Sequence, residues 1–190
     1  MNRTPHHIFR DGLNCLVRDH ERFKIMFLQY RNPCASPTMK KAIVQNITSS
    51  LSIHHTIEEK HLYPLIKRNC HYGNNKIKTL EVDDKIISGL TNLLHKMNNE
   101  DELQMKSYDR TVEKLIGNIN EHIQEQEEEI FPQLRDTMDE AQLEKLFNAL
   151  ESSKWWAPKN AYPFVPKIIQ PLTGVFERAY ETMGHKKTLL

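Results

Sequence analysis

Residues 54–64 read HHTIEEKHLYP, and most of this pattern recurs at residues 122–132 as HIQEQEEEIFP. Both copies begin with a histidine, carry carboxylates in the middle, and end with an aliphatic residue, an aromatic residue and a proline. His54 and Glu58 are four residues apart, so on a helix an imidazole and a carboxylate share one face, one turn apart. Two such helices brought together could hold a pair of metal ions.

The composition of the whole chain is typical of a soluble helical protein. Its 190 residues include 26 Lys and Arg, 25 Asp and Glu, and only six glycines, and its mean hydropathy is −0.64. A net charge near zero does not favour nucleic acid or an anionic membrane as a partner. No apolar run approaches the roughly 20 residues of a membrane span, and the N-terminus lacks an apolar signal region. Three cysteines without CxxC spacing indicate reduced thiols, so we expect a cytoplasmic protein.

Apolar residues at helical spacing predict an all-α fold. The expected long helices span about 13–30, 38–68, 77–97 and 103–135, and a shorter fifth helix spans about 139–152, capped by Asp136 or Asp139. Long helices with short connections are typical of an up-down-up-down four-helix bundle, to which we assign residues 1–153. Residues 154–190 contain four prolines, and we expect them to form a Pro-rich strap with a short helix, packed on the bundle.

Four polar residues fall on the apolar stripes of these helices: His20 on the first, His54 and Glu58 on the second, and His122 on the fourth. An unpaired buried carboxylate costs several kcal/mol, so these side chains need partners. A lone histidine on such a stripe is usually a satisfied core residue, but the repeated motif favours a metal site. Imidazole and carboxylate without thiolate suit non-haem iron, manganese or zinc.

The chain resembles the hemerythrin-like, or HHE cation-binding, family. The residues that carry the resemblance are LVRDH at 16–20 and the two copies of the motif, and the similarity covers roughly residues 10–153. Segment 174–178 (GVFER) is also similar to tails in part of the family. The resemblance implies a four-helix bundle with a non-haem di-iron centre that binds dioxygen, or reacts with peroxide or nitric oxide. Carried over by position, it puts His20, His54, Glu58 and His122 on the metal.

The second copy of the motif departs from the family pattern. Gln126 stands where the family usually has a glutamate, and Gln126 offers only a neutral carbonyl. Glu127 follows His122 by five residues, which on a regular helix turns it roughly 140° away from His122. Glu127 can therefore join the site only if a π-bulge widens the turn, and Glu125 is the alternative.

The third helix departs as well, because the family places a histidine near its start and this chain has Asp83 and Asp84 there. Asp83 lies on the apolar stripe, whereas Asp84 better matches the family spacing, and either could replace an imidazole nitrogen with a carboxylate oxygen. Alternatively, both only begin the helix where negative charge suits its dipole. His55 and His61 flank the stripe of the second helix and are expected to face neighbouring helices or solvent.

These observations support more than one function. The first is a di-iron protein that handles dioxygen, peroxide or nitric oxide. If the third helix supplies an aspartate, the ferric state is favoured, which predicts slow reversible oxygenation and more autoxidation than in a true carrier. The second is an iron- or oxygen-responsive binding module, and the third is a metal-free interaction bundle. The sequence leaves open whether the protein turns over a substrate.

Overall fold

A computed structural model describes residues 10–98 and 104–156, and within these ranges the chain is helical and forms no strand. Two short segments are π-helical and are called η1 and η2. The elements are α1 (Gly12–Tyr30), α2 (Pro37–Ile57), η1 (Glu58–Leu62), α3 (Tyr63–Asn69), α4 (Gly73–Asn98), α5 (Met105–Gln124), η2 (Glu125–Ile130), α6 (Phe131–Thr137) and α7 (Glu140–Trp156). The expected strap lies outside the described residues, apart from residues 154–156, which continue α7.

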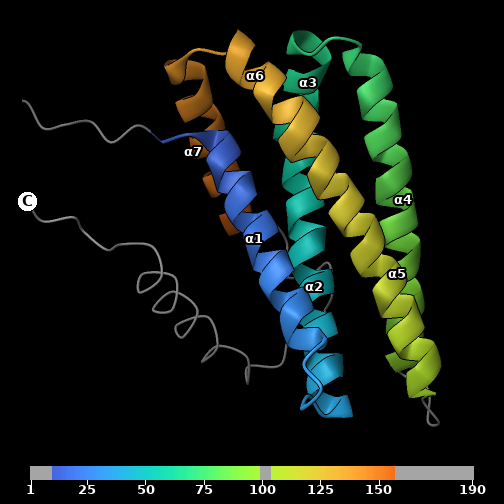
Figure 1. Cartoon of the computed structure of the whole chain (residues 1–190). Coiled ribbons are helices and arrows are strands. Elements are labelled where there is room, and N and C mark those ends of the chain that lie inside the picture. Colours follow the sequence, from blue (N-terminus) through green and yellow to red (C-terminus); the bar gives the residue numbers. More distant parts are fainter. Residues whose placement is uncertain (1–9, 99–103, 157–190) are drawn as a thin grey trace, which may run out of the picture. The chain divides into compact units, whose positions relative to one another are not determined.

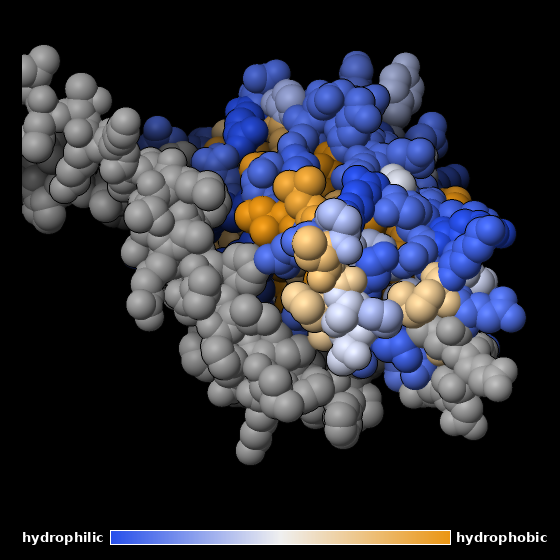
Figure 2. Space-filling view, turned by 60° about the horizontal axis from the view of Figure 1, so that its bottom comes forward, coloured by the Kyte–Doolittle hydropathy of each residue, from blue (hydrophilic) through white to orange (hydrophobic). Residues whose placement is uncertain are grey.

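The predicted long helices appear as four rods that lie side by side: α1, α2–η1–α3, α4 and α5–η2–α6 (Figure 1). The fifth helix, α7, packs along α1. The two helices approach so closely that a Cβ added at Gly12 would lie 2.6 Å from Leu146 Cγ. None of the described helices combines the length and apolar character needed to cross a membrane. Most of the face seen in Figure 2 is hydrophilic.

Side-chain caps explain where several helices begin. The Asp11 carboxylate accepts a hydrogen bond from the Leu13 N–H at 2.7 Å, and the Ser36 hydroxyl accepts one from the Met39 N–H at 3.2 Å. Of the two caps considered for the fifth helix, Asp139 is the one observed: it accepts from the Gln142 N–H at 2.8 Å.

Both π-helical segments fall inside the repeated motif, within two of the predicted long helices, and η2 lies where the sequence analysis gives a π-bulge as the condition for Glu127 to turn inward. The Tyr63 N–H donates to the Glu58 carbonyl, and the Phe131 N–H donates to the Gln126 carbonyl, each five residues back. Pro64 and Pro132 follow directly. Because proline has no N–H and its ring crowds the carbonyl four residues earlier, each copy is poorly suited to regular α-helix at this point. The extra residue per turn changes which side chains face the core.

A layer of polar side chains divides the core into two apolar clusters. On α1, Leu16 belongs to one cluster and Phe23 to the other, with His20 between them. The same order recurs on the fourth rod, where Ile119 and Ile130 flank His122. The buried members of this polar layer are His20, His54, Glu58, Asp84, His122 and Gln126. All four rods therefore present polar groups at one level of an otherwise apolar interior.

Candidate metal centre

The polar layer contains two groups of three residues that could each hold a cation. One group is His20, His54 and Glu58, and the other is His55, Asp84 and His122. Within each group, one potential ligand atom per residue lies within 4.8 Å of the others. The first group comes from α1 and the α2–η1 junction, and the second from α2, α4 and α5.

Glu58 faces both groups. Its Oε1 lies 3.2 Å from His54 Nε2, and its Oε2 lies 3.5 Å from His122 Nε2. Burial alone would raise the pKa of this fully buried carboxyl. The imidazoles of His54 and His122 outweigh burial and hold the pKa of Glu58 well below its ordinary value. An ionised carboxylate therefore lies within 3.5 Å of imidazoles from both groups.

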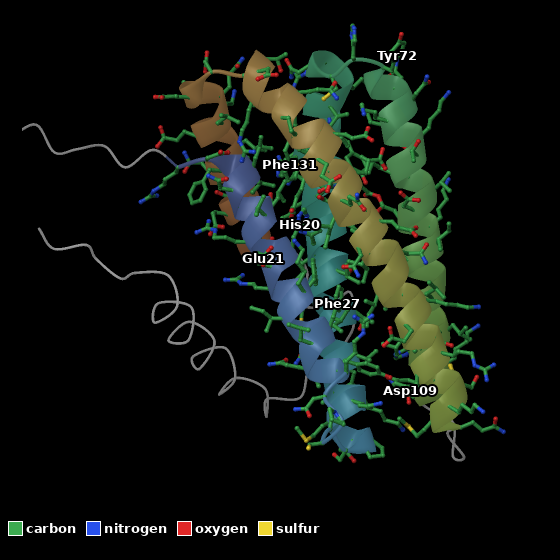
Figure 3. The ribbon with its side chains drawn as sticks, viewed as in Figure 1. His20, Glu21, Phe27, Tyr72, Asp109 and Phe131 are labelled. Atoms are coloured by element: carbon green, nitrogen blue, oxygen red, sulfur yellow. The ribbon has the colours of Figure 1, made fainter. Side chains whose placement is uncertain are left out.

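Glu127 and Phe131 fix the ring of His20. His20 Nδ1 lies 2.7 Å from Glu127 Oε1, and the ring stacks on Phe131 with centroids 6.0 Å apart (both rings are labelled in Figure 3). The π-helical turn η2 supplies the widening that Glu127 needed to reach inward, but Glu127 contacts the Nδ1 side of His20. The other nitrogen, Nε2, is buried without a partner.

His54 has a comparable arrangement. Its Nδ1 lies 3.5 Å from Asp19 Oδ2, and Phe23 packs edge-on against the ring at 5.4 Å between centroids. Burial lowers the pKa of His54, but Glu58 and Asp19 outweigh burial and raise it to about 9. In the metal-free protein, His54 and Glu58 thus form a buried ion pair.

In the second group, His55 Nε2 lies 3.4 Å from Asp84 Oδ1, while the Tyr63 hydroxyl donates to Asp84 Oδ2 at 2.5 Å. Only one oxygen of Asp84 is therefore left for the group. Burial lowers the pKa of His55 to about 4 against the opposing effect of Asp84, so its ring is neutral near pH 7. Of the two aspartates considered from the sequence, Asp84 reaches this group, and the partly exposed Asp83 lies outside both groups.

His55 is the residue of these groups that sequence reasoning did not propose as a ligand. Histidines at consecutive positions of a helix point about 100° apart, so His54 and His55 can face two different neighbours of α2. The pair of consecutive histidines is therefore the feature of the sequence that could have indicated His55 as a second ligand. His61, by contrast, faces a neighbouring helix as expected: its Nε2 lies 2.7 Å from the Ser153 hydroxyl on α7.

Several atoms of the two groups are buried without a hydrogen-bond partner among the described residues. They are His20 Nε2, both ring nitrogens of His54, His55 Nε2, Glu58 Oε2, Asp84 Oδ1 and His122 Nδ1. Most of these atoms have only ion-pair contacts of 3.2–3.5 Å, and His20 Nε2 has none. A buried polar atom without a hydrogen bond costs about 1–3 kcal/mol, so a concentration of such atoms in one layer favours a bound species that pairs with them together. Nitrogen and oxygen donors without thiolate fit a borderline or hard cation.

Comparison with known families bears directly on this layer. The sequence model of the hemerythrin HHE cation binding domain matches residues 11–134. The chain belongs to this family. The matched range contains every residue of both groups, whereas α7 lies beyond it. Searches of the curated proteins and of the solved structures found no match.

In this hemerythrin HHE domain, Gln126 occupies the space between the two groups. Its side chain is fully buried, and its amide nitrogen lies 2.8 Å from Glu58 Oε1 and 2.9 Å from His122 Nε2. An amide N–H thus donates to the Glu58 carboxylate, where a glutamate would instead add a second carboxylate. Gln126 reduces the negative charge of the centre by one unit relative to such a glutamate.

Gln126→Glu is expected to change metal-free and metal-bound stability in opposite directions. Without metal, a second carboxylate beside Glu58 places two like charges in the core, so the melting temperature should fall. With ferrous iron, the added anionic ligand should increase the iron-induced rise in melting temperature. The exposed Gln124→Glu, two residues earlier in the chain, is the matched control and should change neither value appreciably. A Gln126→Glu variant that is more stable without metal would contradict this geometry.

Metal binding by this HHE domain should release protons near pH 7. A metal takes the neutral imidazole, and the raised pKa of His54, about 9, means that the metal-free protein holds a proton there at pH 7. Affinity should therefore rise with pH and level off once His54 is deprotonated without metal. Calorimetric titration with Zn²⁺ in buffers of different ionisation enthalpy measures the released protons. An enthalpy independent of the buffer would show that His54 is already neutral.

Proposed function

We propose that this protein is a non-haem di-iron protein whose centre binds or reacts with dioxygen, peroxide or nitric oxide. The single observation that supports it most strongly is the placement of Glu58, fully buried and within 3.5 Å of imidazoles from two separate ligand groups. A carboxylate shared by two cations offsets part of their mutual repulsion, and facing helices of a bundle commonly build such centres. The rods would follow up-down-up-down order, which the alternating chain directions in Figure 1 support.

In this proposal each group of three holds one ion. His20 and His54 bind the first ion, His55, Asp84 and His122 bind the second, and Glu58 bridges them. Glu127 and Asp83, both candidate ligands from the sequence, are not given a place on the metal. Glu127 instead accepts the Nδ1 proton of His20 and so directs the Nε2 lone pair inward. Tyr63 orients Asp84 in a similar way: its hydroxyl donates to Oδ2, which leaves Oδ1 to bind the ion.

Two iron ions held there would supply redox chemistry toward small oxidants and binding positions for diatomic ligands. The protein contributes orientation and exclusion of water. Phe131 and Phe23 pack against His20 and His54, and apolar clusters lie on both sides of the polar layer. A dry, fixed set of donors is what a reactive metal centre needs to avoid side reactions.

The proposed donor set contains four imidazoles and two carboxylates. Anionic oxygen donors stabilise the ferric state, so the centre should oxidise in air more readily than it carries oxygen reversibly.

The test begins with anaerobic reconstitution with ferrous iron, followed by separate exposure to air, peroxide and nitric oxide while the absorption spectrum is recorded. We expect a nitric oxide adduct and irreversible oxidation by air or peroxide. A stable, reversible oxygenated spectrum would contradict the redox argument, and no spectral response to any of the three would contradict the function. A large iron-induced rise in melting temperature without peroxide turnover would favour an iron-responsive binding module.

A further inference from the structure

A second cluster of reactive side chains joins α1 to α7, outside both metal groups. Lys154 Nζ lies 3.2 Å from Cys15 Sγ, and Glu151 Oε1 lies 3.1 Å from the same sulfur. Lys154 also forms an ion pair with Asp19 at 2.7 Å. The cluster therefore contains a thiol, an amine and two carboxylates, and its lysine and Glu151 come from the helix beyond the family match.

Oxidation of a thiol requires removal of its proton and access for the oxidant, and the side chains around Cys15 bear on both. Cys15 is only 1% exposed, and burial raises the pKa of its thiol, so the sulfur is protonated at rest. Glu151 is positioned to take that proton, and its side chain is 47% exposed, which gives the proton a route to solvent. The Lys154 side chain, which contacts the same sulfur, is 22% exposed, so the thiol lies directly beneath two partly exposed side chains.

We propose that Cys15 and Lys154 form a covalent sulfur–nitrogen cross-link when the protein meets hydrogen peroxide, tying α1 to α7. First the sulfur attacks one peroxide oxygen, the O–O bond breaks, and a sulfenic acid and one water form. Lys154 next passes one ammonium proton to the neighbouring Asp19 carboxylate, and the freed lone pair of its nitrogen attacks the sulfur. An S–N bond forms, the S–O bond breaks, and the sulfenic hydroxyl leaves with a second proton from the nitrogen as a second water. Thiol, ammonium and peroxide thus give sulfenamide, two waters and one proton, with sulfur oxidised and peroxide reduced by two electrons.

Proximity selects this product. A sulfenic acid condenses with a nearby thiol or nitrogen, and the nitrogen of Lys154 is already in contact with the sulfur. Neither Cys34 nor Cys70 has a hydrogen bond to a lysine among the described contacts, so those cysteines should not follow the same route.

The cross-link would also reach the metal layer. In forming it, Lys154 gives up the charge that it now places 2.7 Å from Asp19, and Asp19 faces His54 Nδ1 at 3.5 Å. Cross-linking by peroxide would therefore change the charge next to Asp19 and, through Asp19, the surroundings of His54.

The experiment treats the full-length, chelator-treated protein with hydrogen peroxide and then maps proteolytic fragments by mass spectrometry. We expect a fragment pair joined through Cys15 and Lys154, lighter than the sum of its parts by two hydrogen atoms and released by dithiothreitol. The pair should be absent from Cys15→Ser and Lys154→Arg and from protein treated in denaturant, but present in Cys70→Ser. Lys154→Arg keeps a cation beside Asp19, and a thermal melt verifies that it is folded.

A joined pair carrying one extra oxygen also supports the site, because a second peroxide converts the sulfenamide to a sulfinamide and water. Recovery of Cys15 as an unlinked thiol or trapped sulfenic acid, under conditions that oxidise the exposed Cys34, would overturn the proposal. Equal yield of the joined pair in denaturant would overturn it too, since the folded geometry would then play no part.

Discussion

Glu58→Ala is expected to abolish binding of both metal ions and to destabilise the metal-free protein by about 3–5 kcal/mol. Both losses have one origin. In the folded chain Glu58 is fully buried, pairs with His54 at 3.2 Å and lies 3.5 Å from His122 of the other ligand group. Its removal leaves a buried imidazole without its charged partner, and in the proposed di-iron centre it would leave the two cations without the ligand that screens them from each other. Chemical denaturation and metal analysis measure the two effects separately.

Glu59→Ala is the matched control, because the same residue type one position later is exposed. We expect it to retain full metal content and a free energy of unfolding within about 0.5 kcal/mol of the unmodified protein. If Glu58→Ala still saturates with two ions per chain, Glu58 is not a bridge.

His55→Ala should halve the amount of metal bound at saturation. His55 belongs only to the second group, where it faces Asp84 Oδ1 at 3.4 Å, and the first group keeps its own three residues. The remaining ion also loses a neighbouring positive charge, which favours its retention. Anaerobic titration with ferrous iron, followed by gel filtration and metal analysis, gives the stoichiometry.

The control for His55→Ala is His61→Ala on the same rod, since His61 contacts Ser153 and lies outside both groups. It should keep the metal content of the unmodified protein. Loss of metal from His61→Ala, or full metal content in His55→Ala, would mean that the second group is wrongly composed.

The sequence was sufficient for the helical class and for much of the polar layer. His20, His54, Glu58 and His122 each interrupt an apolar stripe of period 3.6, and helical geometry alone turns them toward the core, where the structure has them buried. The repeated motif further indicated that the second and fourth rods present their polar residues at the same level of the bundle. These are local properties of one helix at a time, which is why they can be read without a structure.

The contacts of Glu127 could not be predicted from the local sequence pattern alone. A regular helix turns Glu127 away from His122, and the π-helical segment η2 changes that phase for every residue after it. Pro132 is a visible cause of the distortion, but the partner of Glu127 is His20, more than a hundred positions away in the chain. Such a contact depends on how α1 and η2 are placed, which one helical pattern does not define.

The choice between Asp83 and Asp84, and the part played by His55, likewise depended on tertiary structure. Consecutive residues on a helix differ by about 100°, so a small rotation of α4 or α2 exchanges which one faces inward. The contacts of Lys154 could not be predicted from the sequence pattern either. It lies outside the repeated motif, and only the packing of α7 on α1 brings it to Asp19 and Cys15.

The most direct test of the central claim is the number of iron ions per chain at the end of an anaerobic titration with ferrous iron. A polar layer that holds two ions around Glu58 predicts saturation at two per chain, falling to none in Glu58→Ala and to one in His55→Ala. Saturation at one ion, or no binding by the folded protein, would contradict it.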